Sequence, residues 1–208
     1  MRGVFESGLW LVALLAVGYL GYVTLDRVVY EKQQERRLQE LSSASTLAFA
    51  SRPMAMGPPP AATRPPPANG DLIGRLDIPD ADISVIVAAG TDPLTLRRGV
   101  GYIPGTALPG EPGNVGLAGH RDTVFRGLRN LRVADRIFLV TADESFEYAV
   151  ESLQTVTPER GDVLNPSAHP TLTLVTCYPF DFVGPAPLRF IVRAREVGRS
   201  TAALRSAP

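Results

Sequence analysis

The chain has 208 residues, of which 45% are hydrophobic and 20% charged, and its basic and acidic side chains balance at 21 each. This length allows one globular domain of ordinary size with room for further segments. A neutral chain gives no reason to expect nucleic acid as a partner, since domains that bind phosphate usually have a clustered basic excess. The single cysteine, Cys177, excludes an intramolecular disulfide and any cysteine-based metal cluster.

The first element in chain order is a long apolar segment, residues 7–25, which contains no charged side chain. About twenty apolar residues, at about 1.5 Å per residue in a helix, cross the hydrocarbon core of a membrane. The aromatic residues Trp10, Tyr19 and Tyr22 lie towards its ends, where such rings prefer the interface. The residues that follow do not fit a signal-peptidase site. Residues 1–25 are therefore predicted to form a short N-terminus and an uncleaved transmembrane anchor.

Two polar segments follow the anchor. Residues 26–41 are rich in helix-forming side chains and are expected to extend the anchor as a juxtamembrane helix. Residues 42–70 contain seven prolines, a composition typical of a semi-stiff linker that cannot bury enough apolar surface to fold. Fully extended at about 3.1 Å per residue, this linker would reach about 90 Å.

The rest of the chain, residues 71–199 followed by a tail at residues 200–208, has the pattern of a small all-β domain. Short alternating or β-branched runs are separated by turn residues. The predicted strands are residues 72–78, 83–87, 114–118, 136–141, 146–157, 171–177 and 188–197, and brief helices are predicted at residues 93–98 and 123–131. Seven or eight short strands indicate a closed barrel or a sandwich.

The lone cysteine lies at the end of the predicted strand 171–177. Alternate side chains of a strand share a face. Leu172 and Leu174 would fill the core, whereas Cys177 would point to the outer face, next to a proline-containing loop. A lone cysteine is ordinarily a small buried apolar residue, but this position favours a catalytic thiol.

The last predicted strand supplies a cation on the same face. Alternate residues of 188–194 are apolar, so Arg189, Arg193 and Arg195 would face outward. If the last two strands pair antiparallel, Arg189 lies beside Cys177, because opposed side chains of paired strands are about 5 Å apart. Arg193 and Arg195 would be further away and are interpreted as solvated surface charges.

The chain has two histidines. His120 follows a predicted strand that runs into Gly119, which puts its imidazole at the rim of the sheet. His169 lies in a loop and is interpreted as a surface residue. A groove shared by His120, Cys177 and Arg189 could support acyl transfer. A thiolate would attack an acyl carbon, an imidazole would move protons, and a fixed cation would steady the oxyanion.

At these residues the sequence resembles the sortase family. Sortases carry a T-L-x-T-C strand, matched by residues 173–177, and a catalytic histidine after a small-residue strand, matched by residues 116–120. Their arginine at the start of the last strand is matched by Arg189. The likeness covers roughly residues 72–197. It implies a closed eight-stranded β-barrel with short connecting helices, preceded by an N-terminal transmembrane helix and a Pro-rich linker.

The resemblance also implies an activity, that of a membrane-anchored cysteine transpeptidase. Sortases cleave a C-terminal sorting signal of secreted proteins, often of the L-P-x-T-G type, and hold the protein as a thioester, here on Cys177. They then pass it to an amine acceptor, such as a cell-wall precursor or a pilin lysine. No cofactor and no metal ion are expected.

Individual roles follow by position from the same resemblance. His120 would be the acid and base, and Arg189 would steady the oxyanion and position the substrate. Ala118 and Thr176 would line the substrate groove. The loop of residues 158–170 would help to shape the pocket for the sorting signal.

Three other classes of protein are considered. An L,D-transpeptidase would have a histidine two residues before the cysteine and an arginine two after it, where this chain has Val175 and Pro179. A papain-like or NlpC-type peptidase places its cysteine before its histidine, and here the order is reversed. A non-catalytic barrel that binds a wall or partner protein, with an incidental thiol, stays open.

The topology in the membrane receives conflicting signals. More positive charges follow residues 7–25 than precede them, which by count favours a cytoplasmic C-terminal domain. Long domains, however, translocate with little regard to charge, and the substrates of sortases lie outside the cell. The N-terminus is therefore predicted to be cytoplasmic and residues 26–208 extracytoplasmic.

Overall fold

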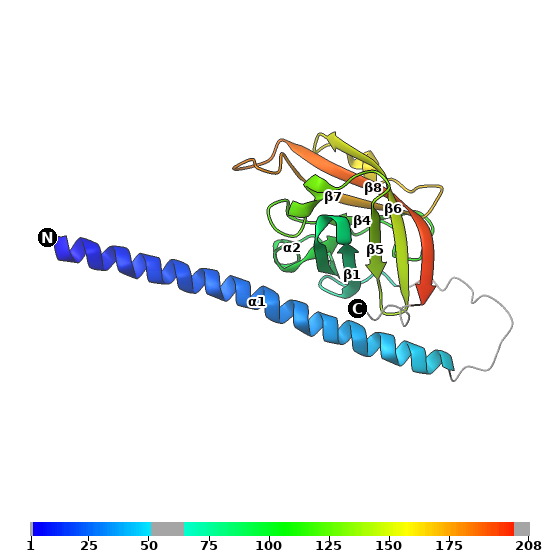
Figure 1. The fold of residues 1–208 in the computed structure, drawn as a ribbon, viewed down its shortest axis with the longest axis horizontal. Coiled ribbons are helices and arrows are strands. Elements are labelled where there is room, and N and C mark those ends of the chain that lie inside the picture. The colour runs from blue at the N-terminus through cyan, green and yellow to red at the C-terminus, as the bar shows by residue number, and fades with distance from the viewer. Residues whose placement is uncertain (1, 51–64, 202–208) are drawn as a thin grey trace.

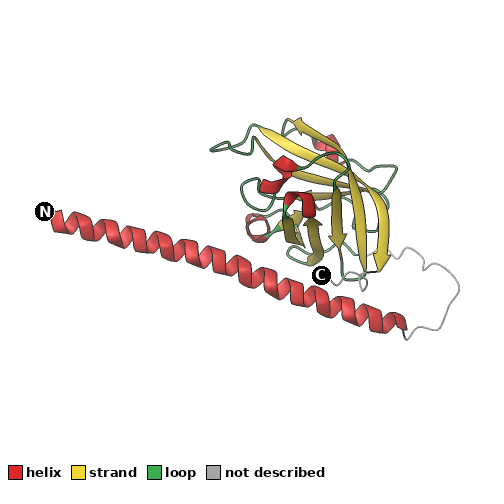
Figure 2. Ribbon diagram, in the orientation of Figure 1, coloured by secondary structure: helices red, strands yellow, loops and turns green. Residues whose placement is uncertain are grey.

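The structure is a computed structural model that describes residues 2–50 and 65–201. A long helix, α1 (Arg2–Ala50), runs beside a β-barrel (Figure 1), and the few other helices are short (Figure 2). The strands are β1 (Leu72–Ile78), β2 (Ile83–Ala89), β3 (Val100–Tyr102), β4 (Asn114–Ala118), β5 (Arg136–Val140), β6 (Glu144–Val156), β7 (Thr171–Tyr178) and β8 (Leu188–Thr201). The short helices are α2 (Pro93–Arg98) and the 3-10 turns η1 (Pro79–Ala81), η2 (Arg126–Asn130) and η3 (Gly161–Leu164).

The eight strands close into a barrel in the order β1-β2-β3-β4-β7-β8-β6-β5. The β1–β5 pairing completes the circle. Two pairs, β2–β3 and β4–β7, are parallel, and the other pairs are antiparallel. The closed eight-stranded barrel expected from the sequence is confirmed, and the sandwich alternative is excluded.

The core fills the interior of the barrel, and every strand contributes to it. Leu172 and Leu174 of β7 are fully buried there, together with Val192 and Ala194 of β8. This is the alternation expected for β7 and β8, so their other faces are left for the groove. Buried side chains of the remaining strands include Leu76, Val87, Val100, Leu117, Leu139 and Tyr148.

Three elements differ from the sequence prediction. Strand β3 was not predicted, because three residues are too few to show a period of two. The helix expected at residues 123–131 is the shorter 3-10 turn η2. Strand β8 continues to Thr201, which pairs with Glu144 of β6, so the tail expected from residue 200 begins later. Residues 202–208 lie outside the described residues.

Helix α1 is also longer than expected. It continues past the predicted juxtamembrane segment, residues 26–41, to Ala50, and so takes in the first residues of the predicted linker. The sequence has no proline or glycine between residues 22 and 52, and the hydroxyls of Ser42 and Ser43 donate to the carbonyl of Gln39 within the helix. Residues 51–64 of the predicted linker lie outside the described residues. Within residues 2–50 and 65–201, no helix combines the length and the apolarity needed to cross a bilayer.

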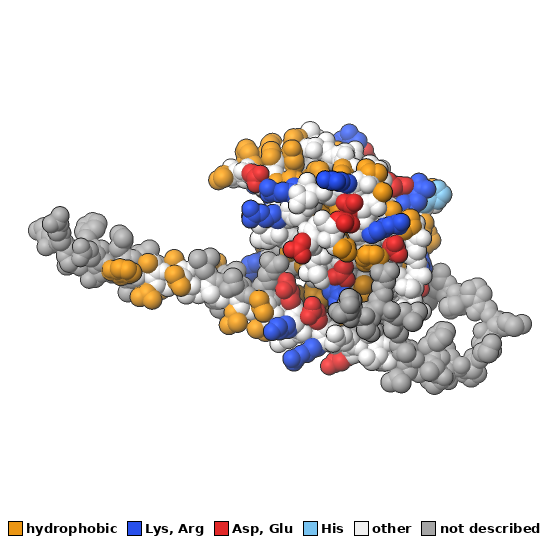
Figure 3. Space-filling model, viewed as in Figure 1, with side chains coloured by type: hydrophobic (Ala, Val, Ile, Leu, Met, Phe, Trp, Pro, Cys, Tyr) orange, Lys and Arg blue, Asp and Glu red, His pale blue; other side chains and the backbone are white. Residues whose placement is uncertain are grey.

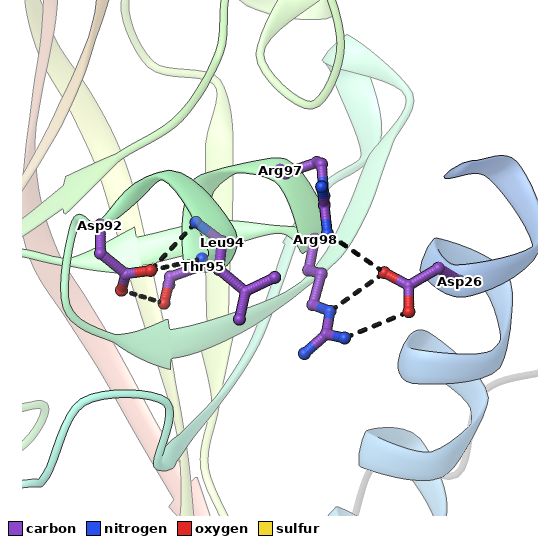
Figure 4. A network of polar contacts seen from close by, with 6 residues as sticks. All are labelled: Asp26, Asp92, Leu94, Thr95, Arg97 and Arg98. Carbon is purple, nitrogen blue, oxygen red and sulfur yellow. Dashed lines mark hydrogen bonds and ion pairs between the residues drawn. The ribbon is translucent and has the colours of Figure 1, made fainter. Parts of the chain in front are cut away.

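One stripe of α1 packs along the barrel. Gln34 and Leu38 are buried there. One and two turns earlier, Tyr30 lies under the guanidinium of Arg98 at 4.9 Å from the ring centroid, and Asp26 forms ion pairs with Arg98 at 3.1 Å and with Arg97 at 3.8 Å. The four α1 residues are spaced by four, so they share one helix face. This face docks the helix against α2 and the barrel, and Figure 4 shows the contact of Asp26 with α2.

The local sequence of α2 presents both of its arginines to α1. Asp92 caps the helix, because its carboxylate accepts the backbone N–H groups of Leu94 and Thr95 at 3.0 and 3.1 Å. Pro93 occupies the first turn, where its missing N–H costs nothing. Arg97 and Arg98 form the last turn, where positive charge suits the negative end of a helix. Figure 4 shows both reaching Asp26.

Candidate active site

Cys177 and Arg189 are direct partners across two paired strands. Strands β7 and β8 pair antiparallel, and their ladder sets Cys177 opposite Arg189. Opposed side chains of such a pair lie about 5 Å apart. The antiparallel pairing inferred from the sequence is confirmed. Arg193 and Arg195 lie opposite Thr173 and Thr171, further along β7 from the thiol.

His120 reaches the same end of the sheet from the other side of β7. Strands β4 and β7 are parallel, and Ala118 pairs with Val175. His120 and Cys177 each lie two residues beyond that pair. The parallel register therefore brings them to corresponding positions at the ends of neighbouring strands. By this register, His120, Cys177 and Arg189 occupy one row at the neighbouring ends of β4, β7 and β8.

The row is open to solvent. His120 is exposed, and Cys177 and Arg189 are half-buried. His169 lies elsewhere, because it precedes the start of β7 whereas Cys177 lies near the end of that strand. Thr171 and Cys177 are six residues apart along β7, so at about 3.3 Å per residue the start of the strand lies about 20 Å from the thiol. His169 is thus not brought to the row.

A hydroxyl within the barrel wall fixes the backbone next to His120. Thr176 is 2% exposed and lies on the inner face of β7. Its hydroxyl donates to the carbonyl of Gly119 at 2.7 Å, and the N–H of Gly119 donates to the carbonyl of Val175 at 3.2 Å. The expectation that Thr176 lines the groove is corrected, since its neighbour Cys177 occupies the outer face. Ala118 lies on the outer face and is half-buried.

The connection between β6 and β7, which includes η3, covers part of the outer face of β4 and β7. The side-chain amide of Asn114 donates to the carbonyls of Val163 and Asn165 at 3.0 and 3.3 Å. The side chain of Leu164 lies so close to Gly116 that a Cβ there would come within 3.0 Å of it. This end of the sheet is covered, and the end at Cys177 is left open. The role expected for residues 158–170, to help shape the pocket for the sorting signal, stays a prediction.

Arg189 has partners on both of the connections that flank the row. Its Nη1 donates to the carbonyls of Ala186 and Leu188 at 3.2 and 2.9 Å. On the other side of β8, Val156 at the end of β6 lies opposite Arg189. Three residues later, the carboxylate of Glu159 accepts hydrogen bonds from its own backbone N–H and from Thr157. These bonds, with a smaller contribution from the charge of Arg189, hold the pKa of Glu159 below its ordinary value. Sequence reasoning missed Glu159, although it lies in the loop expected to shape the pocket.

The arrangement suits nucleophilic acyl transfer. An accessible thiol stands between an imidazole that can carry protons and a guanidinium whose charge and planar donors suit an oxyanion. Neither His169 nor Arg193 offers an alternative, because neither lies near the thiol.

Comparisons with known proteins agree on one family. The family model described as the Sortase domain matches residues 76–197. Sortase D of Bacillus subtilis (strain 168) is 34% identical over 132 residues, which cover 63% of this chain and 67% of that protein. A solved Clostridium perfringens Sortase D5 transpeptidase aligns with a TM-score of 0.64 and 28% identity, covering 81% of this chain and 98% of that one. Sortase E1 from Streptomyces coelicolor, solved with a tripeptide in the active site, aligns with a TM-score of 0.60 and 30% identity, covering 68% and 97%.

Proposed function

We propose, from the premise that this chain belongs to the sortase family of cysteine transpeptidases, that it joins secreted proteins to an amine acceptor at the cell surface. The substrate would carry a C-terminal sorting signal of the L-P-x-T-G kind. The acceptor would be an amine such as that of a cell-wall precursor or a pilin lysine. The tripeptide in the active site of the Streptomyces coelicolor relative supports a peptide as substrate.

The first half of the proposed reaction is acylation of the enzyme. The thiolate of Cys177 attacks the carbonyl carbon of the threonine in the signal, and the negative charge that develops on the oxygen is steadied by Arg189. Collapse of this intermediate breaks the peptide bond to the following glycine. His120 gives a proton to the departing amine, and the protein is left as a thioester on Cys177.

The second half reverses these roles. The acceptor amine attacks the thioester carbonyl and gives its proton to His120. Arg189 again steadies the oxyanion, and the thiolate leaves as the new amide bond forms. The observation that carries this assignment is the direct pairing of Cys177 with Arg189, with His120 at the corresponding end of β4. Ala118, on the outer face beside this row, would contact the signal peptide.

The proposed location follows from the same function. Residues 1–25 would anchor the chain in the bilayer as a single span, with the N-terminus in the cytoplasm and the barrel outside, where sorting substrates and acceptors are found. A fusion of alkaline phosphatase to Pro208 should be active in cells. A fluorescent protein that folds only in the cytosol should be dark at the same position. The opposite pair of results would refute this topology.

Peptide transfer is the direct test of the function. The full chain would be incubated with labelled peptides that carry varied sorting signals, with and without an amine acceptor, and the adducts identified by mass spectrometry. We expect a thioester on Cys177 without acceptor and a transferred product with it. Cys177→Ala should abolish both while the domain stays folded, because the described residues contain no other thiol. Cleavage by the Ala variant at even a tenth of the wild-type rate would remove Cys177 as the nucleophile.

A non-catalytic barrel that binds a partner protein would behave differently in a simpler assay. Its thiol would have no reason to be reactive, and it should resist a methanethiosulfonate reagent until the domain unfolds. A groove cysteine should react at once. The half-buried position of Cys177 at the open end of β7 favours the second outcome.

A further inference from the structure

Two arginines from the β4–β5 connection hold the β7–β8 connection, residues 179–187, in place. Arg121 directly follows His120. Its Nη2 donates to the carbonyls of Phe182 and Gly184 at 2.6 and 3.1 Å, and its guanidinium lies 5.9 Å from the centroid of the Phe182 ring. Arg121 therefore holds the tip of the β7–β8 connection against the segment that begins at His120.

Arg129, in η2, holds the beginning of the same connection. Its guanidinium donates to both carboxylate oxygens of Asp181, at 3.3 and 3.0 Å, and lies 5.3 Å from the centroid of the Phe180 ring. Phe180 in turn packs edge-on against Tyr178 and Phe190, with centroids 5.9 and 5.3 Å apart. This part of the connection is thus tied both to the barrel and to η2.

The held connection is the one that carries a partner of Arg189. Within it, the carbonyl of Ala186 accepts from Nη1 of Arg189. The second acceptor, Leu188, is the first residue of β8 and directly follows the connection. A continuous series of contacts therefore runs from Arg121, beside His120, through the backbone of residues 182–186 to the guanidinium opposite the thiol.

The tip of the connection has little apolar packing of its own. Val183 is 95% exposed and Phe182 43% exposed, and hydrophobic side chains gather over this part of the barrel in Figure 3, with charged ones beside them. Arg121 differs from Arg129 in its burial, because Nη1 of Arg121 is buried without a hydrogen-bond partner among the described residues. Buried donors are normally paired.

We propose that Arg121, with Arg129, is a positioning residue for the transpeptidation proposed above. The two arginines hold the β7–β8 connection where the carbonyl of Ala186 sets the guanidinium of Arg189 opposite Cys177. This inference rests on the proposed function, and it assigns Arg121 an effect that passes through Arg189. Because an oxyanion is steadied mainly in the transition state, loss of Arg121 should lower kcat more than it raises KM.

The expected size follows from the geometry. A displacement of about 1 Å in a catalytic group costs about 10²-fold in rate, and the connection keeps its other attachments when Arg121 is removed. We therefore expect Arg121→Ala to lower kcat by about 10- to 100-fold with KM changed by less than about threefold. Arg129→Ala should act in the same direction. Arg126→Ala is the matched control, because Arg126 is exposed in the same turn η2.

Two readouts separate positioning from stability. The midpoint of thermal unfolding and the rate at which iodoacetamide alkylates Cys177 should stay within a few degrees and about twofold of wild type in Arg121→Ala, since alkylation needs no oxyanion. A double-mutant cycle with Arg189→Ala is decisive, because residues that act as a unit are not additive. In the Arg189→Ala background, Arg121→Ala should lower single-turnover thioester formation by less than about threefold.

The full chain is used throughout, and the wild type is measured first. A wild type that transfers no peptide would overturn the proposed function and this inference together. With an active wild type, three results would overturn the inference alone: kcat unchanged in Arg121→Ala, a loss equal to that of Arg126→Ala, or effects of Arg121→Ala and Arg189→Ala that multiply in full.

Discussion

Thr176 allows a test of what holds the backbone next to His120 in place, because one substitution at Thr176 removes one hydrogen bond and little else. Thr176→Val keeps the shape of the side chain and removes the hydroxyl that donates to the carbonyl of Gly119 at 2.7 Å. The site is 2% exposed, so water does not readily replace the lost donor. Gly119 also has little room to move, since a Cβ there would come within 2.7 Å of the ring of Phe125.

The loss of stability can be estimated from these contacts. A buried neutral hydrogen bond contributes about 0.5–1.5 kcal/mol net, and a partner left unpaired adds to the loss, so we expect about 1–2 kcal/mol. The unfolding entropy is about 2.1 cal/mol/K per residue. For a barrel domain of about 130 residues, Thr176→Val should then lower Tm by about 4–7 °C. Thermal unfolding measured by circular dichroism checks this value.

The effect on catalysis is separated by a second variant. Thr176→Ser keeps the hydroxyl and loses one buried methyl group, which costs about 1 kcal/mol. The two variants should lose similar stability, but Thr176→Val should lower kcat/KM by about 10-fold or more, because the residue before His120 is released. Thr176→Ser should keep most of the activity. Equal kcat/KM for the two variants would refute the idea that this bond positions His120.

Three further outcomes are expected. Arg189→Lys should lower kcat/KM by about 10²-fold, since an ammonium cannot reproduce the planar donor set; an equal loss in Arg193→Lys would contradict the pairing argument. His120→Ala should be severely impaired in peptide transfer, and His169→Ala should keep most activity; equal losses would count against His120. Hydrogen bonding and charge from arginine lower the pKa of Asp26, so helix docking should hold at neutral pH and weaken as pH falls through that lowered pKa. A protection factor against hydrogen exchange in α1 that falls at low pH, with no such fall in Asp26→Asn, would show this.

The parts of the site that depend on local alternation could be predicted from the sequence. The faces of β7 and β8 follow from a period of two, and strands joined by one connection commonly pair, so Cys177 and Arg189 could be placed together. Ala118 could be placed on the outer face for the same reason. The same period places the side chain of Thr176 on the face opposite to that of Cys177. The assignment of Thr176 to the groove did not take this into account.

The parts that depend on contacts distant in sequence could not be predicted. Arg121 and Phe182 are 61 residues apart, and nothing near either residue indicates their contact. Because 20 of the 21 basic residues are arginine, residue type alone did not single out Arg121 or Arg129. The docking of α1 depends in the same way on Asp26 and Arg98, which are 72 residues apart.

The docked face of α1, which begins at Asp26, limits the distance between the barrel and the membrane. The predicted span ends at residue 25, and the ion pairs with α2 begin at the very next residue, Asp26. With residues 7–25 in the bilayer, the barrel would sit directly on the membrane surface, at a height fixed by the turn of helix that α2 contacts. An enzyme mounted in this way would meet its substrates as they emerge from the membrane, and the acceptor would have to come to it.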